Sequence, residues 1–185
     1  MRLFAASSFE PAFVDNLKAV VSYARDNSGR DAVKWVDPLN FHITYAFLGD
    51  LEGPAAAKKG IDAALEGVNA FTIASGGFGV FPSSSHPSVL WVGIGDGAAE
   101  LRELARRLAE GLASAGLMFE ERFEPHITIG RVKAKLPENF LRRTSDYAQA
   151  RRAVSRLASV ELMESGLTAE GPVYRQVYSK RLLSL

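Results

Sequence analysis

A repeated pair of histidine and threonine residues is the first feature of this 185-residue sequence that could carry chemistry. The segments "FHITYAFLG" (41–49) and "PHITIGRV" (125–132) each place a threonine two residues after a histidine, and the histidines are 84 residues apart (126 − 42). Only three histidines occur in the chain. Both segments are rich in β-branched and aromatic residues, which predicts a strand for each. Core packing explains one such triplet more readily than it explains two.

In a strand, residues i and i+2 lie on the same face. His42 is therefore predicted to share a face with Thr44, and His126 with Thr128. Two imidazoles that titrate near neutral pH can act as general acid and general base, because one can be protonated while the other is neutral. A threonine hydroxyl can hydrogen-bond a phosphate oxygen. This chemistry suits in-line displacement at phosphorus, and it leaves open which histidine is the acid.

The elements predicted around the triplets recur in the same order in two halves. Hydrophobic periodicity predicts strands over 2–7, 41–49, 71–81, 88–95, 126–132, 156–165 and 173–183. It predicts helices over 11–27, 54–67, 98–116 and 138–154. The pattern is an α+β fold in one bilobal domain, with β-α-β-α-β repeats at approximately 1–83 and 87–166 and a final strand. A dyad between the halves would bring both histidine strands to a central cleft.

Composition places the chain among ordinary globular proteins, with 47% hydrophobic and 23% charged residues. It has no cysteine, which excludes disulfides, thiol nucleophiles and cysteine metal sites. No signal peptide or stretch long enough to span a bilayer is evident, so we expect a cytoplasmic protein without a membrane partner. We also expect a monomer.

The net charge of +1 conceals an uneven distribution along the chain. Residues 1–100 carry 7 basic and 11 acidic residues, whereas residues 101–185 carry 15 and 10. Among the basic residues of the second half are Arg142, Arg143, Arg151 and Arg152. Such a face can attract phosphates, but charge alone favours a solvated helix surface.

Two His-x-Thr motifs in matched halves resemble the signature of the two-histidine (2H) phosphoesterase superfamily. Five further stretches extend the likeness to nearly the whole chain: "KWVDPLNFHITYAFLG", "FGVFP", "VLWVGIG", "FEPHITIGRVK" and "VELMESGLTAEGPVYRQVYS". Together they are similar to the RNA 2′,3′-cyclic phosphodiesterases, also called 2′-5′ RNA ligases. The resemblance implies a bilobal fold with two antiparallel sheets flanking a cleft.

The resemblance also implies an activity, which is metal-independent opening of an RNA 2′,3′-cyclic phosphate end to a 2′-phosphate. No cofactor or metal is implied, and the partner would be an RNA or oligonucleotide with a cyclic phosphate end. By position, His42 matches the proton donor and His126 the proton acceptor, with Thr44 and Thr128 beside them. Two alternatives remain: a related 2H enzyme acting on a small cyclic nucleotide or a 2′-5′ linkage, and a non-catalytic RNA-binding module.

One departure from the family pattern precedes the "VLW" strand, where Ser88 stands in place of a usual basic residue. Arg131 matches a family arginine and is a candidate phosphate contact. Strict alternation would turn it away from His126 unless Gly130 forms a bulge. The third histidine, His86, lies in a Ser/Pro-rich segment and is predicted to be a surface loop residue.

The remaining candidates are less specific. Asn40 could orient His42 or line the cleft, and four aromatic residues could stack on a base or belong to the core. Those aromatic residues are Trp35, Phe41, Phe123 and Tyr174. Neither histidine belongs to a His-Glu-x-x-His pattern, so the sequence predicts no metal site.

Overall fold

The computed structural model describes residues 1–120, 122–169 and 171–184. Glu170, which belongs to the tail segment that carries part of the family resemblance, lies outside this range. The first half of the chain contains β1 (Arg2–Ser7), α1 (Pro11–Asn27), β2 (Val33–Trp35), the short 3-10 helix η1 (Pro38–Asn40), β3 (Ile43–Asp50), α2 (Ala55–Ala64) and β4 (Phe71–Pro82). The second half contains β5 (Pro87–Ile94), α3 (Ala98–Ser114), β6 (His126–Val132), α4 (Phe140–Ala150), β7 (Val154–Leu157), β8 (Ser159–Leu167) and β9 (Pro172–Arg181).

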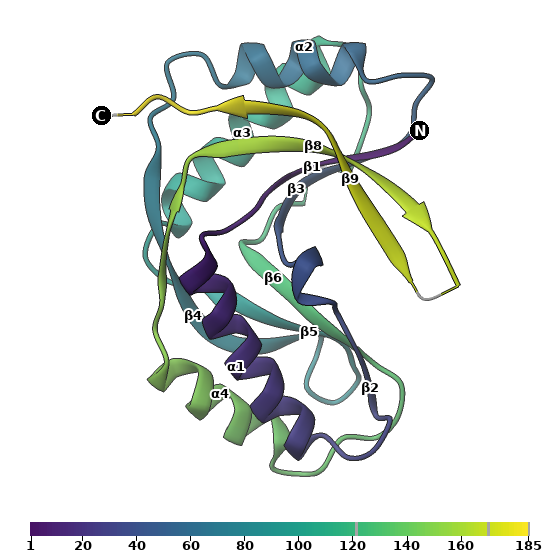
Figure 1. The fold of residues 1–185 in the computed structure, drawn as a ribbon, viewed down its shortest axis with the longest axis vertical. Coiled ribbons are helices and arrows are strands. Elements are labelled where there is room, and N and C mark those ends of the chain that lie inside the picture. Colours follow the sequence, from purple (N-terminus) through teal and green to yellow (C-terminus); the bar gives the residue numbers. More distant parts are fainter. Residues whose placement is uncertain (121, 170, 185) are drawn as a thin grey trace.

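The strands form two antiparallel sheets that exchange strands between the halves. Sheet A has the order β3-β1-β8-β9, and sheet B has the order β2-β6-β5-β4-β7. Sheet A thus joins β1 and β3 of the first half to β8 of the second, and sheet B joins β5 and β6 of the second half to β4 of the first. The two sheets form the upper and lower lobes in Figure 1. The predicted α+β fold with pseudo-symmetric halves is confirmed, while the repeat boundaries stay a prediction.

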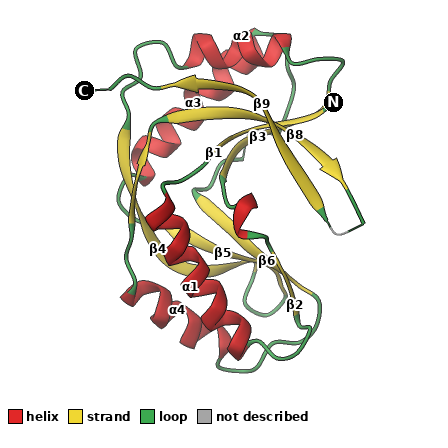
Figure 2. Cartoon of the chain, in the orientation of Figure 1, coloured by secondary structure: helices red, strands yellow, loops and turns green. Residues whose placement is uncertain are grey.

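The helices also cross between the lobes. α1 follows a strand of sheet A but packs with α4 on the β4–β7 side of sheet B, whereas α2 and α3 pack together on sheet A (Figure 2). The apolar stripe predicted for α3 is buried, from Leu101 to Leu112. The buried side of α1 is also the predicted one, comprising Phe13, Leu17, Val20, Val21 and Ala24. Burial of these stripes on the outer sheet faces leaves the opposite faces free to line a cleft.

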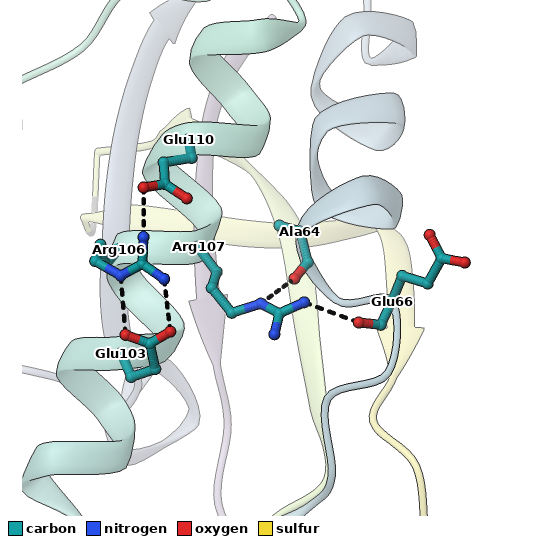
Figure 3. A network of polar contacts seen from close by, with 6 residues as sticks. All are labelled: Ala64, Glu66, Glu103, Arg106, Arg107 and Glu110. Carbon is teal, nitrogen blue, oxygen red and sulfur yellow. Dashed lines mark hydrogen bonds and ion pairs between the residues drawn. The ribbon is translucent and has the colours of Figure 1, made fainter.

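The close approach of α2 and α3 depends on two glycines. A Cβ at Gly60 would lie 2.9 Å from the carbonyl oxygen of Gly111, so a side chain there would push the helices apart. Arg107 of α3 donates from Nε to the carbonyl of Ala64 at 2.9 Å and from its guanidinium to that of Glu66 at 2.8 Å. These bonds satisfy free carbonyls at the end of α2 (Figure 3) and tie the two helices together.

Two predictions about elements are corrected by the structure. The strand predicted over 156–165 is two strands, because the chain leaves sheet B after Leu157 and enters sheet A at Ser159. The alternation of buried and exposed residues continues through Ala158, so the pattern carries no sign of this switch. The strand predicted over 41–49 begins at Ile43, and residues 38–40 before it form η1.

No helix in the described part of the chain is long and apolar enough to cross a membrane.

Candidate active site

A cleft of about 1260 Å³ lies between the two sheets. Its lining includes His42 and Thr44 from the segment that enters β3, and His126 and Thr128 from β6. Ile43, Ile127 and Ile129 alternate with these residues and are fully buried on the opposite faces. The alternation that predicted the two His-Thr pairs therefore holds at both triplets, and the fold brings all four side chains to one site.

The two histidines are held by the same local hydrogen bond. Nδ1 of His42 lies 2.6 Å from the carbonyl oxygen of Asn40, and Nδ1 of His126 lies 2.6 Å from that of Glu124. A carbonyl oxygen can only accept, so Nδ1 is the donor in both rings. Because Nδ1 carries a proton in each ring, Nε2 is the nitrogen that can gain or lose one. Within the described chain, neither Nε2 has a hydrogen-bond partner.

Aromatic rings pack around each imidazole. His42 contacts Phe4 and Tyr174, at centroid distances of 5.2 and 5.3 Å. His126 meets Phe81 edge-on at 5.1 Å, with Trp91 at 6.5 Å. Burial lowers the pKa of His42 below its usual value, the hydrogen bond to Asn40 opposes this shift, and the nearby charge of His126 lowers the pKa further. The two imidazoles are therefore electrostatically coupled.

A β-bulge turns Arg131 into the cleft. In the pairing of β5 with β6, Thr128 lies opposite Trp91 and Gly130 opposite Leu90, so one extra residue is accommodated on β6. Arg131 then lies opposite Val89, which is on the same face as Trp91. The bulge that the sequence left open is present, and Arg131 lines the cleft beside the histidines.

The other candidate residues differ in where they lie. Asn40, Phe123 and Tyr174 line the cleft, although one ring face of Phe123 stacks on Tyr45 at 5.5 Å. Tyr174 is half-buried; its burial raises the pKa of its hydroxyl, while the positive charge of Arg131 lowers it. Tyr174 therefore lies close enough to Arg131 for their charges to interact, and it also contacts His42.

Three residues considered from the sequence have other surroundings. Phe41 is 4% exposed and belongs to the core, so it offers no surface for a base. Trp35 lines the cleft but packs across Gly130, where a Cβ would lie 3.1 Å from its ring. His86 is exposed in a turn, as predicted, and its Nδ1 lies 3.2 Å from the Ser85 hydroxyl, outside the cleft lining.

The basic side chains of α4 do not reach the cleft. Arg142 pairs with Asp146 at 3.6 Å, and Arg151 lies over the ring of Tyr147. Arg152 pairs with Asp96 beyond the end of the helix. These contacts agree with the solvated-surface interpretation of these arginines, and the cations that line the cleft come from other elements.

Lys34 and Phe47 are among the cleft residues that sequence reasoning missed. Lys34 belongs to β2, which pairs with β6 but is only three residues long. Its "VKW" alternation is the one available signal, and it is too short to predict a strand. Phe47 is 70% exposed and lines the cleft, because a second bulge between Thr44 and Ala46 turns it toward the histidines.

Within the described residues, no three side chains of the His, Asp or Glu type come together where they could hold a metal ion. The groups that the cleft presents for chemistry include the imidazoles of His42 and His126, the hydroxyls of Thr44 and Thr128, and the guanidinium of Arg131.

Two antiparallel sheets that each present a histidine and a threonine to one cleft define the class of two-histidine phosphoesterases. The chain belongs to the 2′-5′ RNA ligase superfamily, whose family model matches residues 11–165.

Curated relatives and solved structures agree with this assignment. An RNA 2′,3′-cyclic phosphodiesterase from Aeropyrum pernix is 37% identical over 157 residues, covering 82% of this chain and 88% of the relative. Another from Archaeoglobus fulgidus is 33% identical and covers 96% and 98%. The fold matches TT0787 of Thermus thermophilus with a TM-score of 0.72 at 24% identity over 98% of both chains. It also matches E. coli LigT complexed with 3′-AMP, with a TM-score of 0.71 at 21% identity over 98% of this chain and 96% of LigT.

Proposed function

We propose that this protein hydrolyses RNA 2′,3′-cyclic phosphate ends to 2′-phosphates by metal-independent acid–base catalysis. The observation that carries the proposal is the pair of imidazoles in one cleft, each donating from Nδ1 to a backbone carbonyl at 2.6 Å and keeping Nε2 for proton transfer. The names of the curated relatives support the substrate class. A cytoplasmic location and a monomeric state are part of the proposal.

In the proposed reaction, a water oxygen attacks phosphorus and the bond from phosphorus to O3′ breaks. Nε2 of His126 takes the proton from water, and Nε2 of His42 gives a proton to O3′, which leaves as the 3′-hydroxyl. The hydroxyls of Thr44 and Thr128 hydrogen-bond the two non-bridging phosphate oxygens, and Arg131 adds a positive charge. The product is a 2′-phosphomonoester, and both histidines exchange their protonation states.

The assignment of the donor role to His42 follows the family resemblance. It requires that His42 be protonated when the substrate is bound. Burial lowers the pKa of this imidazole, which favours its neutral form in the free enzyme. A bound phosphate anion favours the protonated form, because opposite charges attract across the cleft. His42 therefore acts as a donor after the substrate raises its pKa.

The test is incubation with nucleoside 2′,3′-cyclic phosphates and identification of the product isomer by chromatography or phosphorus NMR. We expect only the 2′-phosphate, and product formation slower by a factor of about 10² or more in the His42→Ala/His126→Ala double variant. A 3′-phosphate product would mean that O2′ leaves, which would overturn the proposed orientation. Absence of hydrolysis, combined with binding of RNA, would favour the non-catalytic module.

The same displacement with a different nucleophile gives the second candidate activity, which the family description supports. If an RNA 5′-hydroxyl replaces water, its oxygen attacks phosphorus, O3′ leaves, and a 2′-5′ linkage forms. The same two histidines transfer the protons. The measurement adds an RNA with a free 5′-hydroxyl to the cyclic-phosphate RNA, and looks for a joined product that resists cleavage by a 3′-5′-specific nuclease.

A further inference from the structure

The two walls of the cleft differ in chemistry at equivalent strand positions. Phe47 and Arg131 are 84 residues apart (131 − 47), like the two histidines, and a bulge after each His-Thr pair turns them both into the cleft. Phe47 is 70% exposed on sheet A, whereas Arg131 is an exposed cation on sheet B. The two pseudo-symmetric halves therefore form a cleft with one apolar wall and one basic wall.

The basic wall continues beyond Arg131 along the same face. Lys34 of β2 lies directly opposite Arg131 in the antiparallel pairing, and Lys133 follows two residues later with its backbone amide bonded to the carbonyl of Ala32 at 2.7 Å. All three cations are exposed and line the cleft. We call Lys34, Arg131 and Lys133 the basic track. It extends about 16 Å from Thr128 to Lys133, just beyond the end of β6, at ~3.3 Å per residue.

The three cations of the basic track lie close enough together to repel one another. Side chains directly opposite on neighbouring strands have Cβ atoms about 5 Å apart, and like charges there repel. Within the described residues, no carboxylate forms an ion pair with Lys34, Arg131 or Lys133. The carboxylates Glu120 and Glu124 of the lining pair instead with Arg122 and Arg102. A bound polyanion would relieve this repulsion.

The opposite wall suits unpaired bases. Phe47 and Leu39, 70% and 94% exposed, line the cleft from β3 and η1, and Val173 of β9 is also exposed there. Aromatic side chains beside a basic groove are the usual combination for binding single-stranded nucleic acid, because bases stack on the rings while cations follow the backbone. A mononucleotide filling the histidine site would leave the far end of this arrangement unused.

We propose that Lys34 and Lys133 of the basic track bind the backbone phosphates of the single-stranded nucleotides that precede the cyclic phosphate, with their bases toward the Phe47 wall, while Arg131 stays at the terminal phosphate. The inference rests on the proposed function for the position of the terminal phosphate between His42 and His126. The enzyme is then selective for oligonucleotide ends over mononucleotides. Lys34 and Lys133, which lie beside and beyond Arg131 along the same wall of the cleft, supply this selectivity.

The test compares kcat/KM for an eight-nucleotide single-stranded RNA ending in a cyclic phosphate with that for a nucleoside 2′,3′-cyclic phosphate. In Lys34→Ala/Lys133→Ala, we expect kcat/KM for the RNA to fall about fivefold per lysine at low salt, and the value for the mononucleotide to fall less. The matched control is Lys59→Ala/Arg143→Ala, which removes two exposed cations from α2 and α4 and should change neither value. Equal losses on both substrates, or no loss on either, would overturn the track.

A binding measurement separates failure of the track from failure of the proposed function. The same RNA with a 2′-phosphate end is titrated at several salt concentrations, without any need for turnover. The slope of log K against log salt should be shallower in the Lys34→Ala/Lys133→Ala variant by about 1.4, at ~0.7 for each phosphate that a lysine no longer neutralises. Identical slopes in wild type and variant would overturn the track, even if the enzyme hydrolyses cyclic phosphates.

A paired RNA end tests the single-stranded part of the proposal. A hairpin RNA whose cyclic phosphate sits on a blunt, base-paired end offers no free bases to the Phe47 wall. We expect its kcat/KM to be about tenfold lower than that of the same hairpin with a four-nucleotide single-stranded tail. Equal values for the two hairpins would show that unpaired bases are not required.

Discussion

Asn40 connects His42 to the β8–β9 hairpin of the same sheet. Its backbone carbonyl accepts Nδ1–H of His42 at 2.6 Å, and its side-chain amide donates to the carbonyl of Pro172 at 3.1 Å. Pro172 begins β9, the second strand of the β8–β9 hairpin, which projects to the right in Figure 1. One residue thus orients the imidazole through its backbone and holds the β8–β9 hairpin through its side chain.

Replacement of Asn40 by Ala should therefore separate binding from chemistry. The variant keeps the carbonyl that orients His42 but loses the bond to Pro172, so we expect KM to rise about fivefold, the value of one hydrogen bond, with kcat nearly unchanged. Steady-state kinetics on a cyclic-phosphate RNA measure the two constants. A fall in kcat with unchanged KM would mean that the side chain acts on the chemical step.

The histidines are expected to act as a unit. His42→Ala and His126→Ala should each lower kcat by about 10² to 10⁴, the usual effect of losing a general acid or base. The double variant should be little worse than the weaker single variant, because each residue is useful only with the other. His86→Ala, at the exposed third histidine, is the control and should retain full activity. Near-normal kcat in either single variant would remove that histidine from the mechanism.

Much of the fold follows from patterns that the sequence carries locally. The buried stripes of α1 and α3 were predictable because each helix buries one face, and the same logic gave the faces of His42 and His126. The exchange of β4 and β8 between sheets was not predictable, because it depends on contacts between segments far apart in the chain. Such non-local pairing leaves no periodic signal in either strand.

The site residues could be predicted where residue type and spacing alone indicate the chemistry. His42, Thr44, His126 and Thr128 repeat a pattern, and the bulge at Gly130 could be anticipated from the glycine. Lys34 could not be predicted because it lies in a three-residue strand. Phe47 could not be predicted because its direction depends on a bulge beside Thr44 that contains no glycine. Prediction failed at residues that reach the cleft only through irregular backbone.

Gly79 is predicted to be required for the placement of Trp91. An added Cβ at Gly79 would occupy the position of the Trp91 indole, which lies 5.1 Å from Phe81 and 6.5 Å from His126 between ring centroids. Gly79→Ala should lower the free energy of unfolding by about 1–3 kcal/mol through overpacking. It should also lower kcat, because the Trp91 ring that packs near His126 would be displaced. Chemical denaturation and kinetics measure the two effects.

The control for this variant is Gly166→Ala. A Cβ at Gly166 would meet only the carbonyl oxygen of Val173, at 3.7 Å, which is an ordinary contact. We expect little change in stability there. Equal stability of Gly79→Ala and wild type would mean that the Trp91 ring is free to shift, and that it does not hold His126 in place.

Activity should survive removal of metal ions. In the proposed mechanism the imidazoles perform both proton transfers, and threonine and arginine side chains bind the phosphate, so no step calls for a Lewis acid. The measurement is kcat after prolonged dialysis against a chelator, with and without added divalent ions. Loss of activity that one particular divalent ion restores would contradict the two-histidine mechanism.

The pH dependence of the reaction is predicted to be bell-shaped, because turnover needs one neutral and one protonated histidine. Burial lowers the pKa of His42 below its usual value in the free enzyme. As the proton donor, His42 must be protonated, so this lowered pKa reduces the fraction of free enzyme in the productive protonation state at neutral pH, and with it kcat/KM. Bound phosphate raises this pKa, so the basic limb of kcat should lie at higher pH than the basic limb of kcat/KM.

Variants then assign the two limbs. If His42 is the donor, the activity that remains in His42→Ala should lack the basic limb, while His126→Ala should lack the acidic limb. The opposite pattern would exchange the roles of the two histidines and keep the mechanism. A wild-type profile that is flat from about pH 5 to 9, with the chemical step shown to limit the rate, would mean that His42 and His126 are not an acid and a base.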